Sequence, residues 1–78
     1  MKISYLRWQD ITASSDWLLP EDVMGLCNVE TVGYLVCEDK NQVQLADSFD
    51  RQGNKYAGVI TIPKPVILKR KTIGTRIA

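Results

Sequence analysis

The stretch VETVGYLVCED, residues 29–39, decides the fold class of this chain. Its apolar side chains fall on both faces of an extended strand, with Val32, Tyr34 and Val36 on one face and Val29, Leu35 and Cys37 on the other. Gly33 stands in the middle, and a glycine inside a strand usually marks a sharp bend or a close approach of another backbone. Because a small β-barrel needs strongly bent strands, the stretch predicts one.

The rest of the chain alternates extended segments with short turns. We predict strands at residues 2–8, 29–39, 43–49 and 56–63, and a last strand that ends near residue 73 after a single turn from Lys64. β-branched and aromatic residues alternate with polar ones in these segments, as strands require. Gly53 and Asn54 are suited to positive φ in the turn at residues 50–55, and Pro63 stops its strand because it has no N–H to donate.

Residues 12–28 interrupt the β character. Pro20, Glu21 and Asp22 have the composition of the first turn of a helix, and Ser14 or Ser15 can cap a turn before it. We therefore predict an all-β fold of five strands, partly closed into a small bent barrel, with a short helical turn in its N-terminal part. At this length, residues 1–78 form a single domain.

The composition is that of a folded domain, and its strand faces indicate that it associates with other chains. Of the 78 residues, 45% are hydrophobic and 24% are charged, as in ordinary globular proteins. No signal-peptide pattern or membrane-spanning segment is visible, so we expect a cytoplasmic protein with no membrane partner. A core this small covers only one face of each strand, and two strands are apolar on both faces. The second apolar face predicts a homo-oligomer.

Catalytic and metal-binding patterns do not emerge from the sequence. The chain has no histidine, and we interpret its two cysteines, Cys27 and Cys37, as small buried apolar residues. Glu38 and Asp39 are adjacent carboxylates, but general acid–base chemistry needs a second group held opposite them in a dry pocket. We expect solvated turn acids there, with Asp39 a hydrogen-bond acceptor at the bend. The sequence predicts no enzyme activity, no metal and no cofactor.

Charge is segregated along the chain. All nine acidic residues lie in residues 1–50, whereas residues 51–78 hold seven basic residues and no acid. Two interpretations stand. In the first, the last strand returns beside the first strand, so that basic and acidic side chains partly neutralise one another in space. In the second, a basic surface meets an acidic partner or nucleic acid. That surface would be built around Lys64, Lys69, Arg70, Lys71 and Arg76.

The six aromatic residues also allow two interpretations. Interleaved with Lys40, Arg51 and Lys55, they would stack on single-stranded bases. The alternative is that Trp8 and Trp17 are the largest pieces of a small core.

The same central stretch resembles the first motif of the Sm (LSm and Hfq-like) family. Gly33, Leu35 and Asp39 stand in its Gly-x-Leu-x-x-x-Asp pattern, and an alternating apolar strand with Asp47 follows. The segment YAGVITIPKPVIL, residues 56–68, is similar to the second motif, in which a glycine precedes two apolar strands joined by a tight turn. The resemblance covers about residues 29–73. The whole chain also resembles small uncharacterised proteins of tailed bacteriophages, including marine, cyanophage-type ones.

The resemblance implies a five-stranded Sm-like (SH3-like) barrel that assembles into a ring by strand pairing between neighbours. In Sm proteins that bind RNA, the turns of the two motifs hold the bases. Here the first turn is one residue shorter, with Asn41 in place of the motif's asparagine, and Pro63-Lys64 stands where the motif has arginine and glycine. The residues this comparison assigns to nucleic-acid binding are Lys40, Asn41 and Lys64.

These observations lead to two hypotheses about function. The first is a non-enzymatic, phage-encoded Sm-like ring that binds RNA or another nucleic acid in the host cytoplasm. The second is an SH3-like adaptor or host-takeover module that binds a host protein by its sheet edge or basic C-terminal segment.

Overall fold

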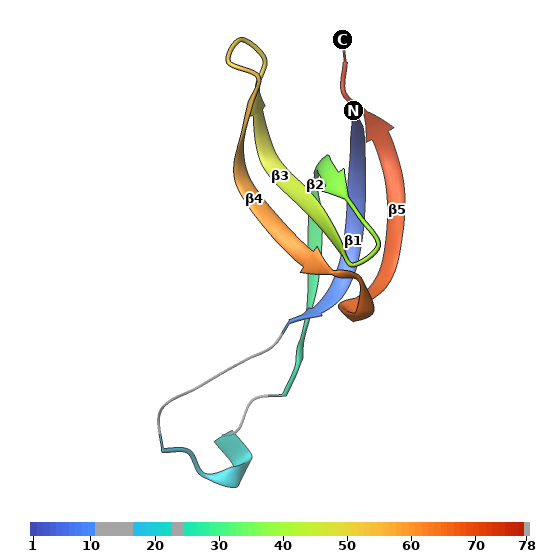
Figure 1. Ribbon diagram of the computed structural model, residues 1–78. Coiled ribbons are helices and arrows are strands. Elements are labelled where there is room, and N and C mark those ends of the chain that lie inside the picture. The colour runs from blue at the N-terminus through green and yellow to red at the C-terminus, as the bar shows by residue number, and fades with distance from the viewer. Residues whose placement is uncertain (11–16, 23–24, 78) are drawn as a thin grey trace.

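A single antiparallel β-sheet of five strands makes up most of the molecule (Figure 1). The computed structural model describes residues 1–10, 17–22 and 25–77. The strands are β1 (Lys2–Asp10), β2 (Cys27–Glu38), β3 (Gln42–Asp50), β4 (Lys55–Pro63) and β5 (Ile67–Thr75). Two short 3-10 helices accompany them, η1 (Pro20–Asp22) and η2 (Lys64–Val66). The predicted all-β class and the five strands are confirmed, as is the single turn before the last strand.

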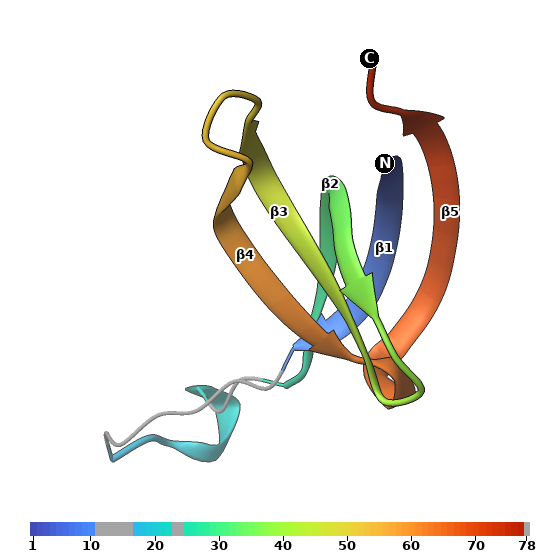
Figure 2. The ribbon, with the colours of Figure 1, turned by 45° about the horizontal axis from the view of Figure 1, so that its top comes forward.

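The sheet is strongly curved but does not close. Its strand order is β4-β3-β2-β1-β5, so β4 and β5 form the two edges in the described part of the chain. Figure 2 shows β4 and β5 on opposite sides of the curved sheet, with β2 and β1 between them. The described part of one chain therefore does not form a closed barrel. The N-terminal helical turn is only the 3-10 turn η1, and a cap at Ser14 or Ser15 lies outside the described residues.

Gly33 marks the point where β2 changes neighbours. The first part of β2, residues 27–34, pairs with β1, and its last part, residues 34–38, pairs with β3. A Cβ atom built on Gly33 would lie 2.6 Å from the carbonyl oxygen of Ala46 in β3, closer than real Cβ contacts come. Only glycine permits this backbone approach, so the predicted close contact at Gly33 is confirmed.

The core lies on one face of the sheet, between its curved halves. Its fully buried side chains come from β1, β3 and β4, namely Leu6, Val43, Leu45 and Ile62, with Trp8 almost fully buried. Trp8 Nε1 donates a hydrogen bond to Thr31 Oγ1 at 3.0 Å, so its one polar atom is satisfied. The core interpretation is confirmed for Trp8 and wrong for Trp17, which is fully exposed beside η1.

The cysteine prediction is also wrong. Cys37 is exposed and Cys27 is half-buried, and neither forms a disulfide. Neither belongs to the cluster of buried core residues. Cys27 is the first residue of β2, and Cys37 follows the register shift after Leu35, where it pairs with Gln44 instead of a core residue. Within the described ranges, no helix is both long enough and apolar enough to cross a membrane.

Candidate functional site

The three residues assigned to nucleic-acid binding come from two turns at one end of the sheet. Lys40 and Asn41 lie between β2 and β3, and Lys64 begins η2 between β4 and β5. The backbone N–H of Lys64 donates to the carbonyl oxygen of Asn41 at 2.8 Å. This hydrogen bond joins the two turns into one unit, which we call the turn pair (residues 39–41 and 64–66). Lys40 and Asn41 are exposed in it, and Lys64 is half-buried.

Asp39 holds the first of these turns in shape. Its Oδ1 accepts hydrogen bonds from the backbone N–H groups of Asn41 at 2.7 Å and Gln42 at 3.0 Å. The backbone N–H of Asp39 donates to the carbonyl oxygen of Gln42 at 3.1 Å, which closes the turn. The carboxylate is thus the structural hydrogen-bond acceptor that the sequence predicts.

Glu38 is the centre of an ion-pair cluster that the sequence analysis missed. Arg70 in β5 binds its carboxylate with both terminal nitrogens, at 2.8 and 2.9 Å, in the planar fork geometry that favours this pair. The Lys64 ammonium lies 2.8 Å from the same carboxylate. Hydrogen bonds from Arg70 first, and then from Lys64, lower the pKa of Glu38 from 4.5 to about 2. The spacing of 32 residues between Glu38 and Arg70 hides this contact from any local motif.

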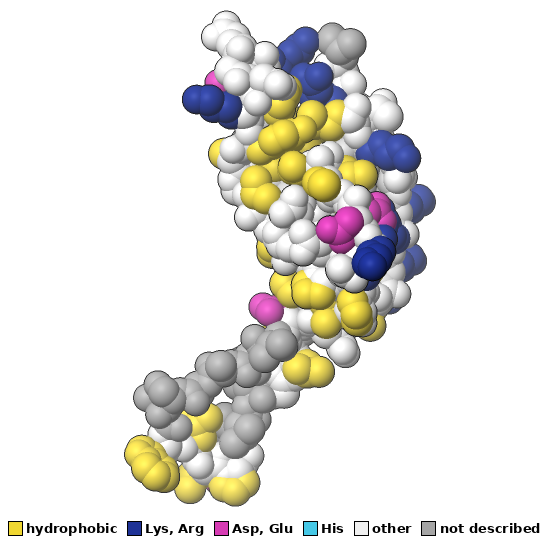
Figure 3. Space-filling model, in the orientation of Figure 1, with side chains coloured by type: hydrophobic (Ala, Val, Ile, Leu, Met, Phe, Trp, Pro, Cys, Tyr) yellow, Lys and Arg dark blue, Asp and Glu magenta, His cyan; other side chains and the backbone are white. Residues whose placement is uncertain are grey.

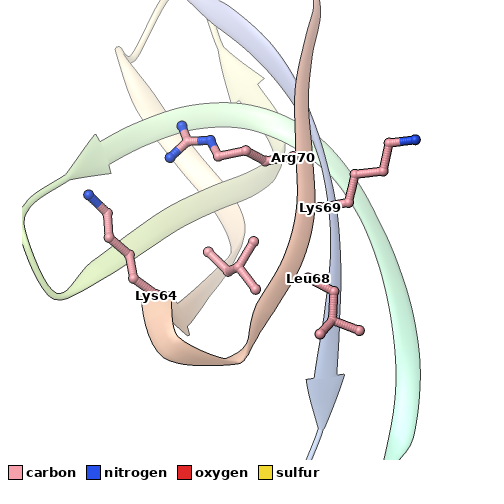
Figure 4. A pocket seen from close by; sticks show the side chains of 5 residues that line it. Lys64, Leu68, Lys69 and Arg70 are labelled. Atoms are coloured by element: carbon pink, nitrogen blue, oxygen red, sulfur yellow. The ribbon is translucent and has the colours of Figure 1, made fainter.

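A shallow pocket of about 320 Å³ lies beside this cluster, between η2 and β5. Figure 4 shows the heads of Lys64 and Arg70 on the same side of β5, whereas the ammonium of Lys69 extends to the other side. Lys64 and Arg70 are both held by the Glu38 carboxylate, so the exposed Lys40 is the cation of the turn pair best placed to meet an anion.

The remaining basic residues of β5 gather on the face opposite the core. Lys69 and Lys71 stand beside Arg7 and Tyr5 of β1 in the sheet register. All three cations are exposed, and the Tyr5 hydroxyl donates to Glu30 Oε2 at 3.2 Å. The last strand therefore does return beside the first, as predicted. Neutralisation is partial: Glu38 pairs with Lys64 and Arg70, while Arg7, Lys69 and Lys71 form a basic strip on the outer face.

Neither metal chemistry nor a known family guides the assignment further. In the part of the chain that the structure describes, no three acidic or cysteine side chains come close enough to hold a metal ion. Comparison with protein-family models finds no match, and the searches of curated proteins and of solved structures find none either. The turn pair, the sheet edges and the surface charge are therefore the features that indicate a function.

The Glu38 cluster makes stability depend on pH in the acid range. Because folding lowers the pKa of Glu38 to about 2, its stabilisation is complete above about pH 4.5 and is lost as the pH falls toward 2. Since 30% of the side chain is exposed, we expect the pair to contribute no more than about 1 kcal/mol at pH 7. In urea titrations, Glu38→Gln should lower the free energy of unfolding at neutral pH. Below pH 4.5 the free energy of unfolding of this variant should fall less steeply with pH than that of the original chain.

Glu21→Gln is the matched control for this experiment, because Glu21 is an exposed residue of η1. It should leave the unfolding curve and its pH dependence close to those of the original chain. If the free energy of unfolding fell equally with acid in the original chain and in Glu38→Gln, the role of Glu38 in the pH dependence would be contradicted.

Proposed function

We propose that this chain is a non-enzymatic, Sm-like module whose copies join edge to edge into a ring and bind RNA with the turn pair. The proposed place of action is the cytoplasm, which is that of the host cell if the chain is phage-encoded. The observation that carries the proposal is the pair of unpartnered sheet edges, β4 and β5.

Both edges carry the features of an interface. The outer backbone groups of β4 and β5 have no partner strand in the described part of the chain, and such groups invite pairing with another chain. Val59 in β4 and Leu68 and Ile73 in β5 are about half exposed, so each edge also offers apolar surface. A second copy that pairs with an edge would cover both the backbone groups and these side chains.

Charge favours pairing β4 of one copy with β5 of the next. β5 contains Lys69, Arg70 and Lys71, so two β5 edges side by side would bring like charges together. β4 carries only Lys55 at its first position. A β4-to-β5 contact also occupies both edges of every copy, whereas pairing of identical edges leaves one edge of each copy open. Such a head-to-tail contact closes into a ring when the rotation between copies permits.

A ring would repeat the turn pair once per copy. Each copy would contribute an exposed ammonium from Lys40 and an amide from Asn41, held by the Asn41–Lys64 hydrogen bond. Repeated cations and amides suit a single strand of RNA, since cations bind its phosphates and amides can bond base edges.

The alternative function is an adaptor that binds a host protein by a sheet edge. The same edges β4 and β5 would accept an extended peptide as an added strand. In this case the chain stays monomeric alone, so the oligomeric state separates the two functions.

Substitution at the edges tests the assembly. We expect light scattering at tens of micromolar to give a discrete multiple of the 8.8 kDa chain mass. Val59→Lys and Ile73→Lys should each reduce it to the monomer, because an ammonium would enter the interface without a partner. Val32→Lys is the matched control: Val32 is exposed to a similar extent, 53% against 49% and 51%, but lies in the central strand β2. A clean monomer for the original chain would overturn the ring and favour the adaptor.

RNA titration tests the ligand. Labelled uridine-rich and adenine-rich strands, measured by fluorescence anisotropy at two salt concentrations, should bind most tightly at low salt. Lys40→Ala should weaken binding and reduce the salt slope by about 1 for each copy whose Lys40 contacts a phosphate. Lys71→Ala removes the same charge from the outer face of β5, and it should have the smaller effect. Equal losses in the two variants would show that the turn pair has no special role, and no binding at low salt would remove RNA from the proposal.

A further inference from the structure

A second pocket lies at the end of the sheet opposite the turn pair. It has a volume of about 330 Å³ and is formed where β1 begins and where β3 and β5 end. We call it the arginine pocket and define it by Ile3, Tyr34, Phe49, Arg51, Arg76 and Ile77. In Figure 1 both chain ends and the β3–β4 turn lie at this end. Figure 3 shows basic side chains there beside a hydrophobic surface.

The guanidinium of Arg76 is held in place within this pocket. It lies over the ring of Phe49, with 4.6 Å from its central carbon to the ring centroid. Phe49 in turn packs against Tyr56, with ring centroids 5.0 Å apart. The backbone N–H of Arg76 donates to the carbonyl oxygen of Met1 at 2.8 Å, which fixes the chain just after β5. The cation is therefore positioned before any ligand arrives.

The same guanidinium has an unused donor. Arg76 Nε is buried from water and has no hydrogen-bond partner among the described residues. A buried donor without an acceptor costs free energy, and this cost favours a small turn of the side chain that brings Nε–H to an oxygen acceptor on a ligand. A phosphate or carboxylate can bind an arginine side-on, through Nε–H and one terminal N–H together.

The lining selects an anion with a flat ring. Arg51 and Arg76 bring two positive charges to one cavity, and no carboxylate is among the described residues that line it. Tyr34 supplies aromatic surface for stacking, whereas the Phe49 ring is covered by Arg76, and Ile3 and Ile77 supply apolar walls. The volume lies near the lower end of the range for small-ligand sites, roughly 300–1,000 Å³, so it suits one ring with one phosphate.

We propose that the arginine pocket binds one phosphorylated nucleoside unit, with the phosphate on Arg76 and Arg51 and the base against Tyr34. The unit could be a free mononucleotide or one nucleotide of a single strand, and the chemistry of recognition is the same. This inference deepens the proposed nucleic-acid binding and rests on it for the strand-bound form. It adds a second contact point, at the far end of the sheet from the turn pair.

Calorimetric titration with four probes tests the pocket: adenosine monophosphate, inorganic phosphate, phosphotyrosine and a short single-stranded RNA. We expect the mononucleotide to bind, and inorganic phosphate to bind more weakly because it has no ring to stack. Arg76→Lys keeps the charge but loses Nε and the fork, so mononucleotide affinity should fall about tenfold. Arg7→Lys is the matched control on the outer face of β1 and should change nothing. Tyr34→Leu should weaken binding of the mononucleotide and leave binding of inorganic phosphate unchanged, because it removes the stacking ring and keeps the Phe49–Arg76 contact.

The outcomes separate the pocket from the proposed function. RNA binding that is unaffected by Arg76→Lys, together with no mononucleotide binding, overturns the pocket and leaves the turn pair as the RNA site. Mononucleotide binding that depends on Arg76, without RNA binding at low salt, supports the pocket and removes the RNA function. Equal affinity for phosphate and mononucleotide overturns the stacking role. Tighter binding of phosphotyrosine overturns the nucleoside assignment in favour of a phosphopeptide.

Discussion

The contact between Gly33 and the carbonyl group of Ala46 is the constraint on which the rest of this structure depends. At this point β2 stops pairing with β1 and starts pairing with β3, and a side chain at position 33 would occupy the place of the Ala46 carbonyl oxygen. The hydrogen-bond register also shifts between Leu35 and Cys37, which adds to the bend. Along its twelve residues β2 pairs first with β1 and then with β3, and the glycine at position 33 allows the β3 backbone to come this close.

The end of β2 beyond this bend reaches across the sheet. Glu38 pairs with Arg70 of β5, although β1 lies between β2 and β5 in the strand order. The same carboxylate binds Lys64, whose backbone is joined to Asn41 in the neighbouring turn. The bend therefore brings together the ion-pair cluster and the turn pair. In the described part of the chain β4 and β5 are the open edges of the sheet, and the proposed assembly uses them.

The sequence predicted the elements well because their signals are local. Alternating side chains, turn residues and Gly33 indicated five strands and one close backbone approach, and Asn54 adopts the positive φ expected of its turn. The burial of Cys37 and Trp17 was predicted wrongly, since alternation and amino-acid type do not say which face a small core covers.

The candidate sites were harder to predict than the strands. Asn41 and Lys64 were singled out on a resemblance and do lie together, but the partners of Lys64 and Arg70 depend on a contact between residues 32 positions apart. The arginine pocket combines residues from the beginning of β1, the end of β3 and the end of β5. No spacing along the chain marks such a group, because the register of the sheet assembles it.

One pair of substitutions tests the central claim most directly. Gly33→Ala and Gly74→Ala make the same change in β2 and β5, but a Cβ atom at Gly74 would meet only a side-chain carbon of Ile3 at an ordinary 3.9 Å. Measured by urea unfolding at equal chain concentration, Gly33→Ala should lose about 1–3 kcal/mol or more because the β2–β3 backbone contact must open. Gly74→Ala should be neutral or more stable by up to about 1 kcal/mol. Equal stability of the two variants would contradict the account.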